Sequence, residues 1–449
     1  MPARTSLHLV RVGSVACLLL AGCIAPVRLA PSRSATETGA AEARLCSFCG
    51  WRRCYQLSNG LVRVTNVPQV GGRTLEYSLG PYNFLFIGHK ELGTTLADSA
   101  DKRYRYFGGH FAQLHPEAKW LSLQSTHPPG LLMSAYQART LPCEAGKAAI
   151  EMAAPPDLAT GTQLVRTIEL FEGSTRLRLT DTLTNTRSAP QDWGIHDILQ
   201  LKGFPALDGV LDGTERPTGR LVLYVPLNPG SRFRGGVQQV VEGRGGPPSP
   251  AQWSTRELPG ILTIRYRRQF GKALVDPNLP WIAFVDQGLG YAFVQRCAVP
   301  QKAILTAGGP LQEYPLIEVH CFAPVASLAP GGTATLVQDW YAARCAGPVL
   351  DVTEAGIVSS PLSLLRGGGK TWVAGTFGVF WVGRAAAVFR GADGAELARV
   401  DCGPVSPHQP FTLDRVVAPP QETREVALEV SDAAGNVIGH LGKVHLGPP

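Results

Sequence analysis

The sequence predicts an all-β protein that contains many tight turns. Short runs of valine, isoleucine, leucine, threonine and aromatic residues recur along the chain, with glycine, proline, asparagine or aspartate between them. Fifty glycines and 36 prolines among 449 residues supply the turns. Helical periodicity is nearly absent, and an apolar content of 44% in a chain of this length is enough for more than one domain.

Residues 1–22 have the order of a bacterial secretory signal. A basic front with Arg4 and Arg11 precedes a short apolar run. The run is shorter than the roughly 20 apolar residues that a membrane-spanning helix needs. The quartet Leu20-Ala21-Gly22-Cys23 resembles a lipobox, in which the cysteine is lipidated and becomes the new N-terminus. We therefore expect a lipid on Cys23, and the alternative is a plain signal that is cleaved elsewhere.

Residues 23–44 are expected to form a disordered tether, because they are rich in alanine, proline, serine and threonine and carry no sustained apolar period. Ile24 rather than aspartate follows Cys23, which by resemblance to lipoprotein sorting favours the outer membrane. The expected location is the bacterial cell envelope, lipid-anchored, with the folded part facing the periplasm or the cell surface.

The charge of the chain argues against nucleic-acid binding. The formal net charge is +7, and removing the two arginines of the signal leaves +5. This excess is spread along the sequence without a long basic run. We expect no nucleic-acid partner.

Cysteine usage fits an exported protein. Apart from Cys17 in the signal and Cys23, eight cysteines remain: Cys46, Cys49, Cys54, Cys143, Cys297, Cys321, Cys345 and Cys402. An even number in an oxidising compartment favours disulfides, whose pairing the sequence does not determine. The cluster CSFCGWRRC at 46–54 also has a zinc-ligand spacing, but no second cysteine pair or histidine pair follows it. Disulfides are the favoured interpretation, and no metal is expected.

Candidate strands recur between residues 61 and 342. The expected strands are 61–67, 73–79, 83–88, 162–171, 175–185, 193–201, 220–225, 261–270, 281–286, 290–296, 315–322 and 333–342. Segments 124–160 and 228–260 are heavy in glycine, proline and serine, and we expect them to be long surface loops.

The strand pattern restarts after Cys345. Residues 347–449 have the length and rhythm of a small Ig-like β-sandwich, with a hairpin signal at residues 434–436. The phrase RGGGKT at 366–371 is not a phosphate loop, because that motif needs a glycine where Leu364 stands. It predicts a turn, and the domain is expected to have a structural or positioning role.

Two of the strands carry ionisable groups on their less apolar faces. Alternation in 193–201 places Gly194, His196, Ile198 and Gln200 on one face, and in 315–322 it places Leu316, Glu318, His320 and Phe322 on one face. A carboxylate among apolar neighbours is paired, protonated or functional, because burying a bare charge is costly. A lone strand histidine or glutamate is more often structural, so these residues alone leave their function open.

The span from about Tyr55 to Arg344 resembles the galactose-mutarotase-like superfamily. The resemblance rests on the order of four blocks: LSNGLVRVTNVPQVGGRTLEYSLGPYNFLF, GGHFAQLHPEAKW, VPLNPGSRF and IEVHCFAPVASLAPGGTATLVQDWY. It is nearest to a branch that is known only as a domain of unknown function. The resemblance implies a large antiparallel β-supersandwich over residues 45–346, followed by the small sandwich.

Aldose 1-epimerases of this superfamily use a histidine as general acid and a glutamate as general base. Their histidine lies six residues after a proline that follows an Asn-Thr pair, as His196 follows Pro190 and Asn185-Thr186 here. Their glutamate lies on a late strand before a Pro-Gly turn, as Glu318 lies before Pro330-Gly331. The resemblance therefore implies His196 as the acid and Glu318 as the base of anomer exchange, with no cofactor or metal.

Three further residues are candidates for sugar contact, two of them by the same resemblance. His110 and Arg73 stand nearest to an early histidine and arginine of those enzymes, and Glu117 could accept hydrogen bonds from sugar hydroxyls. The alternatives are a loop-end histidine bonded to backbone, an arginine paired with a carboxylate, and a solvated loop carboxylate. One departure is Ile195, since active epimerases have asparagine directly before the histidine.

Carbohydrate is the expected partner under two of three functions that remain open. The first is an aldose 1-epimerase-like enzyme, and the second is a non-catalytic carbohydrate-binding protein. Sugar binders stack pyranose faces on exposed aromatics, although Trp120, Trp193, Trp281 and Trp340 are more often core residues in a sandwich. The third is a structural envelope lipoprotein without a small ligand.

Overall fold

Strands with one buried and one less buried face make up almost all of the described chain. The computed structural model describes residues 39–98, 105–119, 129–142, 144–204, 207, 220–240, 252–267, 271–298, 301–306 and 314–446. The expected signal, Cys23, Cys143 and Trp120 lie outside these residues, as does most of the expected tether. Within them, no helix has both the length and the apolar character needed to cross a membrane.

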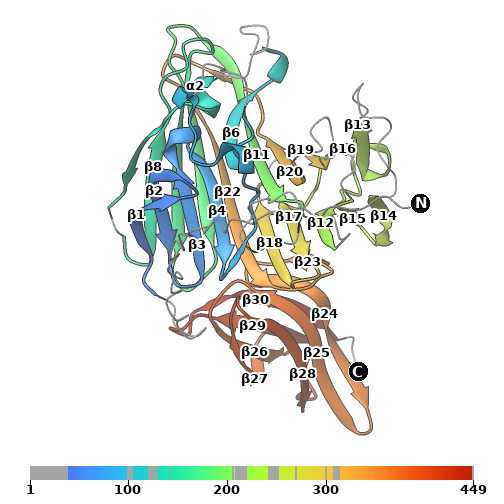
Figure 1. The fold of residues 1–449 in the computed structure, drawn as a ribbon. Helices are drawn as coiled ribbons and strands as arrows, with labels where there is room; N and C mark the ends of the chain where they lie inside the picture. Colours follow the sequence, from blue (N-terminus) through green and yellow to red (C-terminus); the bar gives the residue numbers. More distant parts are fainter. Residues whose placement is uncertain are drawn as a thin grey trace, which may run out of the picture. The chain divides into compact units, whose positions relative to one another are not determined.

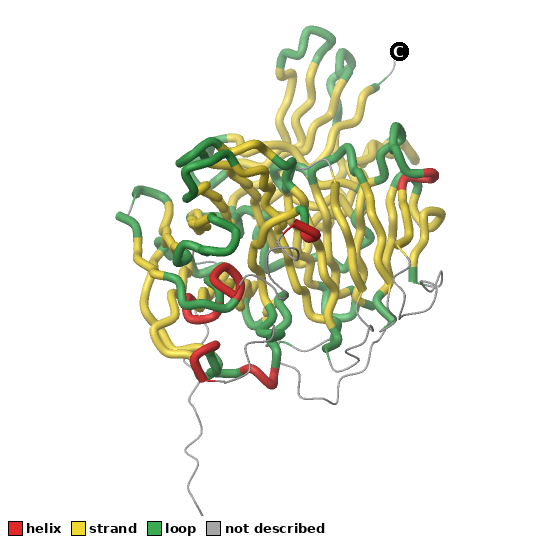
Figure 2. The backbone as a smooth tube through the Cα atoms, turned by 90° about the horizontal axis from the view of Figure 1, so that it is seen from above, coloured by secondary structure: helices red, strands yellow, loops and turns green. Residues whose placement is uncertain are grey.

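The strands form two large and two small antiparallel sheets (Figure 1), and Figure 2 shows few, short helical turns among them. The first large sheet runs in the order β1 (Glu42–Phe48), β2 (Trp51–Ser58), β3 (Val62–Val67), β4 (Arg73–Leu79), β6 (Gly109–His115), β11 (Gln191–Lys202), β20 (Leu316–Phe322), β19 (Gln301–Thr306), β16 (Gly271–Val275) and β13 (Val237–Val240). Beside this path, β5 (Tyr82–Asn83) pairs with β4 and β21 (Ala326–Leu328) pairs with β11.

The second large sheet runs in the order β14 (Trp253–Leu258), β15 (Ile261–Arg265), β12 (Leu221–Pro226), β17 (Trp281–Asp286), β18 (Tyr291–Arg296), β22 (Thr333–Arg344), β10 (Leu177–Asn185), β9 (Thr162–Phe171), β8 (Lys147–Ala153) and β7 (Gln137–Thr140). The short helices are η1 (Pro68–Val70), η2 (His89–Glu91), η3 (Leu96–Asp98), α2 (Pro129–Leu132) and η4 (Arg234–Gly236).

The two small sheets form the C-terminal sandwich, the group of orange to red strands in Figure 1. One contains β23 (Asp351–Val352), β24 (Gly356–Gly367), β25 (Lys370–Val379) and β28 (Pro410–Val417). The other contains β27 (Glu396–Val405), β26 (Gly383–Arg390), β29 (Glu425–Ser431) and β30 (Val437–His445). The sandwich has a hydrophobic core of its own, which includes Phe377 and Phe389. The predicted all-β fold with a small second sandwich is therefore confirmed.

The main core lies between the inner faces of the two large sheets. Strand β11 shows why: Trp193, Ile195, Leu199 and Leu201 all belong to this core, as the alternation predicts. Trp193, Trp281 and Trp340 are at most 2% exposed, so these three tryptophans are core residues and offer no face to a sugar.

The glycine turn of residues 366–371 is also as predicted. It joins β24 to β25, and Gly368 and Gly369 have φ angles of 55° and 73°. Glycine adopts this left-handed backbone without the steric cost that a side chain brings.

Some sequence expectations are wrong. The expected loops 124–160 and 228–260 contain strands β7, β8, β13 and β14. In β8 the buried side chains include two alanines, which carry a weaker strand signal than valine or isoleucine. The expected strand 83–88 is mostly irregular, with Asn83 at the end of β5 and isolated bridges at Leu85 and Ile87. Strand β1 begins at Glu42, so residues 42–44 are not part of a tether.

The expected disulfides do not form among the seven described cysteines. Cys46 and Cys54 lie opposite each other in the β1–β2 hairpin but are not bonded. Within the described chain, the residues grouped closely enough to hold a metal ion are His110, Asp181 and Asp197, so the cysteine cluster does not gather into a metal site.

Candidate functional site

The candidate site lies where β6, β11 and β20 run side by side. In the antiparallel register, His196 of β11 faces Gln113 of β6 and Phe322 of β20, and Gln200 faces Glu318. Residues directly opposite one another share a face of the sheet, and so do residues two apart on one strand. Gln113, His196, Gln200, Glu318 and His320 therefore lie on one face, and this face is turned away from the main core.

These five side chains form a continuous line of hydrogen bonds, which we call the polar row. Gln113 Nε2 lies 3.0 Å from His196 Nδ1, and His196 Nε2 lies 2.8 Å from His320 Nδ1. His320 Nε2 lies 3.4 Å from Glu318 Oε2, and Gln200 Nε2 donates to Glu318 Oε1 over 2.6 Å. His196 and Glu318 are thus brought to one site, with the His320 ring between them.

The donors along the row assign a single set of histidine tautomers. The Gln113 amide N–H donates to His196 Nδ1, so His196 carries its proton on Nε2 and donates to His320 Nδ1. His320 then carries its proton on Nε2 and donates to Glu318. Every hydrogen bond of the row points toward the carboxylate.

Burial sets the protonation states at the two ends. Only 4% of His196 is exposed, and burial together with the neighbouring His320 and His115 holds its pKa well below the ordinary value. Burial raises the pKa of Glu318, but the hydrogen bond and charge of His320 and the hydrogen bond of Gln200 outweigh it, so this pKa is lowered. The row at neutral pH therefore holds a neutral His196 and an ionised Glu318.

The exposed part of the row is the His320–Glu318 end. The side chains of His320 and Glu318 are 11% and 12% exposed. The Phe322 ring stacks on the His196 ring with centroids 4.2 Å apart and covers it. A molecule that binds on this face meets His320 and Glu318 before it meets His196.

His320 is a residue of the polar row that the sequence alone does not single out. His320 alternates with Glu318 on the same strand and was expected on the same face. The sequence does not show the register of β20 against β11. This register places His320 diagonally beside His196.

The other expected site residues have different environments. Arg73 is fully buried, with its guanidinium 3.8 Å from the centre of the Phe111 ring and NH1 donating to the Gly108 carbonyl. Glu117 is exposed just after the end of β6. The expected lipidation site, Cys23, is outside the described residues.

His110 lies on the opposite face of β6, between the two large sheets. It faces Leu199 across the strand pair and is 0% exposed. Its Nδ1 accepts from Arg166, and its Nε2 bonds to Asp197. This environment gives His110 protein partners on both ring nitrogens, and the sheet separates it from the polar row.

Arg166 lies at the centre of a buried group with His110, Asp181 and Asp197, which we call the inner cluster. Its Nε donates to Asp181 over 2.7 Å, and a terminal nitrogen donates to His110 Nδ1 over 2.7 Å. The ligand atoms of His110, Asp181 and Asp197 lie within 4.8 Å of one another, the spacing of a metal site. The guanidinium already provides the positive charge that a metal ion would supply here, so the cluster is explained as a buried ion-pair network.

Several solved structures are similar to this chain, and the matches include galactose mutarotase-like proteins. One from Clostridium acetobutylicum has a TM-score of 0.47 at 11% identity and covers 68% of this chain and 99% of its own. Another from Lactobacillus casei has a TM-score of 0.41 at 10% identity, covering 64% and 99%. A galactose mutarotase related enzyme from Lactobacillus acidophilus has a TM-score of 0.36 at 8% identity, covering 64% and 96%. No protein-family model and no curated protein matches the chain.

The buried neutral His196 predicts a specific dependence of stability on pH. An unfolded chain binds a proton at this histidine near pH 6.5, and the folded protein does so only at much lower pH. Between those two values the unfolded state binds more protons, so the free energy of unfolding falls as the pH falls below about 6.5. We expect His196→Gln to make this fall shallower in urea titrations between pH 7 and pH 5.

Glu318 titrates outside this window, since its pKa is already lowered from 4.5. An unchanged slope in His196→Gln would mean that the imidazole is not held neutral by the fold.

Proposed function

We propose that the polar row is an acid–base site that interconverts the anomers of a cyclic sugar, as aldose 1-epimerases do. The observation that carries this proposal is the unbroken hydrogen-bonded line that ends in the adjacent, partly exposed His320 and Glu318. General acid–base catalysis needs a donor and an acceptor held within reach of the reacting atoms.

Anomer exchange has two proton transfers at atoms bonded to one carbon. A base removes the proton of the anomeric hydroxyl, an acid protonates the ring oxygen, the ring opens, and it closes again on the other face. Glu318, which is ionised at neutral pH, is the base in this proposal. His320 Nε2, 3.4 Å from the carboxylate, is the acid at the second oxygen. Adjacent donor and acceptor atoms suit two oxygens that share a carbon.

His196 serves in this proposal as a positioning residue behind His320. It is 4% exposed and its Nε2 faces His320, so we assign the direct acid role to His320 instead. The Oε1 atom of Gln113 is buried without a partner. Turning the Gln113 amide over would let this oxygen accept from His196 Nδ1, and the row could then reverse its hydrogen bonds and hold an added proton on His320.

The proposal is tested by following the α-to-β conversion of freshly dissolved glucose, galactose and larger reducing sugars by polarimetry. Wild type is expected to exceed the spontaneous rate for at least one sugar in a saturable manner. His320→Gln is expected to remove the acceleration, and His196→Gln to lower kcat with little change in KM. If wild type accelerates none of these sugars, the epimerase proposal fails.

We also propose that the protein is a lipid-anchored envelope protein, attached through Cys23. The lipobox-like quartet supports this proposal. Labelled palmitate is expected to enter wild type and the Cys17→Ser variant but not Cys23→Ser. Equal labelling of Cys23→Ser would contradict the proposed lipid anchor at Cys23.

A further inference from the structure

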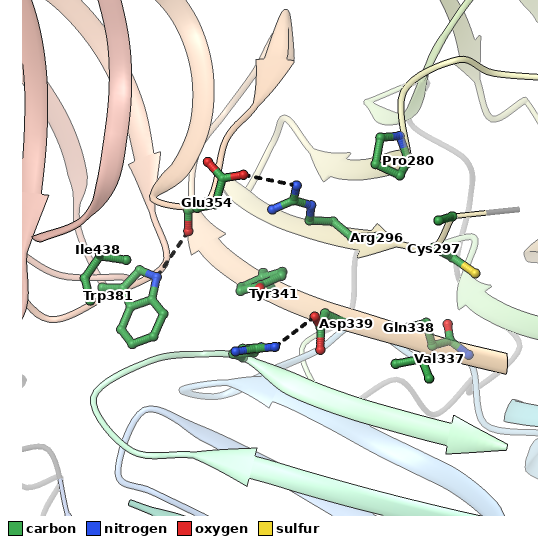
Figure 3. Close-up of a pocket in the computed structure, with 12 residues that line it drawn as sticks. Pro280, Arg296, Cys297, Val337, Gln338, Asp339, Tyr341, Glu354, Trp381 and Ile438 are labelled. Carbon is green, nitrogen blue, oxygen red and sulfur yellow. Dashed lines mark hydrogen bonds and ion pairs between the residues drawn. The ribbon is translucent and has the colours of Figure 1, made fainter. Parts of the chain in front are cut away.

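A pocket of about 480 Å³ lies where the outer face of the second large sheet meets the C-terminal sandwich (Figure 3). Its polar and aromatic walls are Arg176, Arg296, Asp339, Tyr341, Glu354 and Trp381. The Asp339 and Tyr341 side chains point away from the main core, since Trp340 between them belongs to it. The pocket and the polar row are therefore on the outer faces of different sheets, with the main core between them.

The two sides of this pocket are tied together by backbone and core contacts. Thr175 N–H donates to the Phe380 carbonyl over 2.9 Å, and Val382 N–H donates to the Gly173 carbonyl over 2.9 Å. Tyr341 stacks on Phe380 with ring centroids 4.6 Å apart, inside a buried cluster that both sides share. The pocket is thus formed before any ligand binds.

The charged groups of the pocket are already paired. Asp339 lies 3.1 Å from Arg176 and 2.9 Å from Arg178, and Arg296 lies 3.6 Å from Glu354. Each of these charged side chains already has a partner of opposite charge, so neither an anion nor a cation meets an unopposed group. A neutral ligand keeps these ion pairs intact.

The ion pairs also present donors beside acceptors. A sugar hydroxyl both donates and accepts a hydrogen bond, and neighbouring hydroxyls match a guanidinium N–H next to a carboxylate oxygen. In Figure 3, Tyr341 lies between Asp339 and the Arg296–Glu354 pair. Several hydrogen-bonding groups therefore converge on one volume.

An aromatic ring completes the pocket. Trp381 is half-buried, and its indole Nε1 donates to the Glu354 carbonyl over 3.2 Å, which fixes the ring against this wall. Indole and phenol rings offer apolar faces with polar edges, which suit the C–H face of a pyranose. The volume falls within the range of about 300 to 1,000 Å³ that is usual for small-ligand pockets.

We propose that this pocket is a non-catalytic binding site for a neutral saccharide of one or two rings. The ligand stacks on Trp381 and its hydroxyls bond to the Arg176–Asp339 and Arg296–Glu354 pairs. Binding at this site does not depend on the chemistry of the polar row. The site would hold a glycan whether or not a sugar is bound at the polar row.

Methyl glycosides test this inference without turnover at the polar row, because they cannot exchange anomers. The measurement is calorimetric titration of the whole protein with methyl glycosides of glucose, galactose and mannose, with neutral disaccharides, and with inorganic phosphate. At least one neutral sugar is expected to bind at concentrations up to tens of millimolar, and phosphate is not. Absence of binding by every sugar, or binding of phosphate alone, overturns the proposal.

Variants locate the binding. Trp381→Ala and Asp339→Asn are each expected to weaken sugar binding about tenfold or more, whereas Asp401→Asn, which changes a surface ion pair outside the pocket, leaves it unchanged. Trp381→Phe preserves more of the packing and identifies the Trp381 indole N–H signal in NMR spectra by its loss. That signal is expected to shift when the sugar binds to wild type, and an unmoved signal places the sugar elsewhere and contradicts the proposal.

Discussion

Glu318→Gln is expected to lower the rate of sugar anomer exchange by about 10²- to 10⁴-fold, the range that one general acid or base supplies. Glutamine has the shape of glutamate, and its carbonyl oxygen still accepts a hydrogen bond from His320. It cannot take the proton of the anomeric hydroxyl. Because Glu318 is partly exposed at the end of the polar row, the loss is expected in the catalysed rate with little change in stability.

The matched control is Glu117→Gln, which changes an exposed carboxylate outside the polar row. This variant is expected to keep the wild-type rate. Polarimetry of all three proteins at one sugar concentration, with denaturation midpoints recorded alongside, makes the comparison. A Glu318→Gln variant that retains the wild-type rate would show that this carboxylate is not the base.

Arg166→Met is expected to cost about 3 to 5 kcal/mol of unfolding free energy, the usual cost of breaking a buried ion pair from one side. Arg166 is 1% exposed, and it lies directly opposite Asp181 in the β9–β10 pair. Methionine fills much of the same space but leaves Asp181 and Asp197 buried without this cation. Urea or guanidinium denaturation followed by fluorescence measures the loss.

Arg139→Met is the control, because it breaks an ion pair of the same kind at the surface. Arg139 lies opposite Glu151 in the β7–β8 pair, 2.8 Å from its carboxylate, and its side chain is 66% exposed. The expected cost is about 1 kcal/mol or less. Equal losses in the two variants would contradict the view that the inner cluster depends on buried charge.

Strand periodicity was enough to predict the faces of β11 and β20. Both strands have one face in the main core, so alternation alone separated His196 and Glu318 from Trp193 and Val319. On β6 both faces are buried, and the sequence gives no contrast that would show His110 to point inward. The expectation for His110 therefore rested on its position in the chain, which does not determine its environment.

Strand periodicity in the sequence does indicate the inner cluster. Arg166 stands between Leu164 and Ile168 on the buried face of β9, where a charged residue requires a buried partner. Its partner Asp181 has the same place between Leu179 and Leu183 on β10. Which carboxylate pairs with which arginine depends on the strand register, and that information comes only from the fold.

The sequence does not predict the Trp381 pocket, for a different reason. Its wall residues come from distant parts of the sequence, from Arg176 to beyond Glu354. The two members of each ion pair are also far apart in the chain. Among the tryptophans that could stack on a sugar, Trp193, Trp281 and Trp340 are core residues, and Trp120 lies outside the described residues. Trp381 belongs to the C-terminal sandwich, for which a structural or positioning role was expected.

The most direct test of the polar row is histidine side-chain ¹⁵N NMR of the wild-type protein, recorded through a pH titration. The polar row predicts that His196 remains neutral, with its proton on Nε2, well below pH 6.5. His320 is expected to hold a proton on Nε2 beside Glu318 and to respond when a sugar is added. A His196 signal that titrates near pH 6.5 would contradict the row and the proton transfer proposed from it.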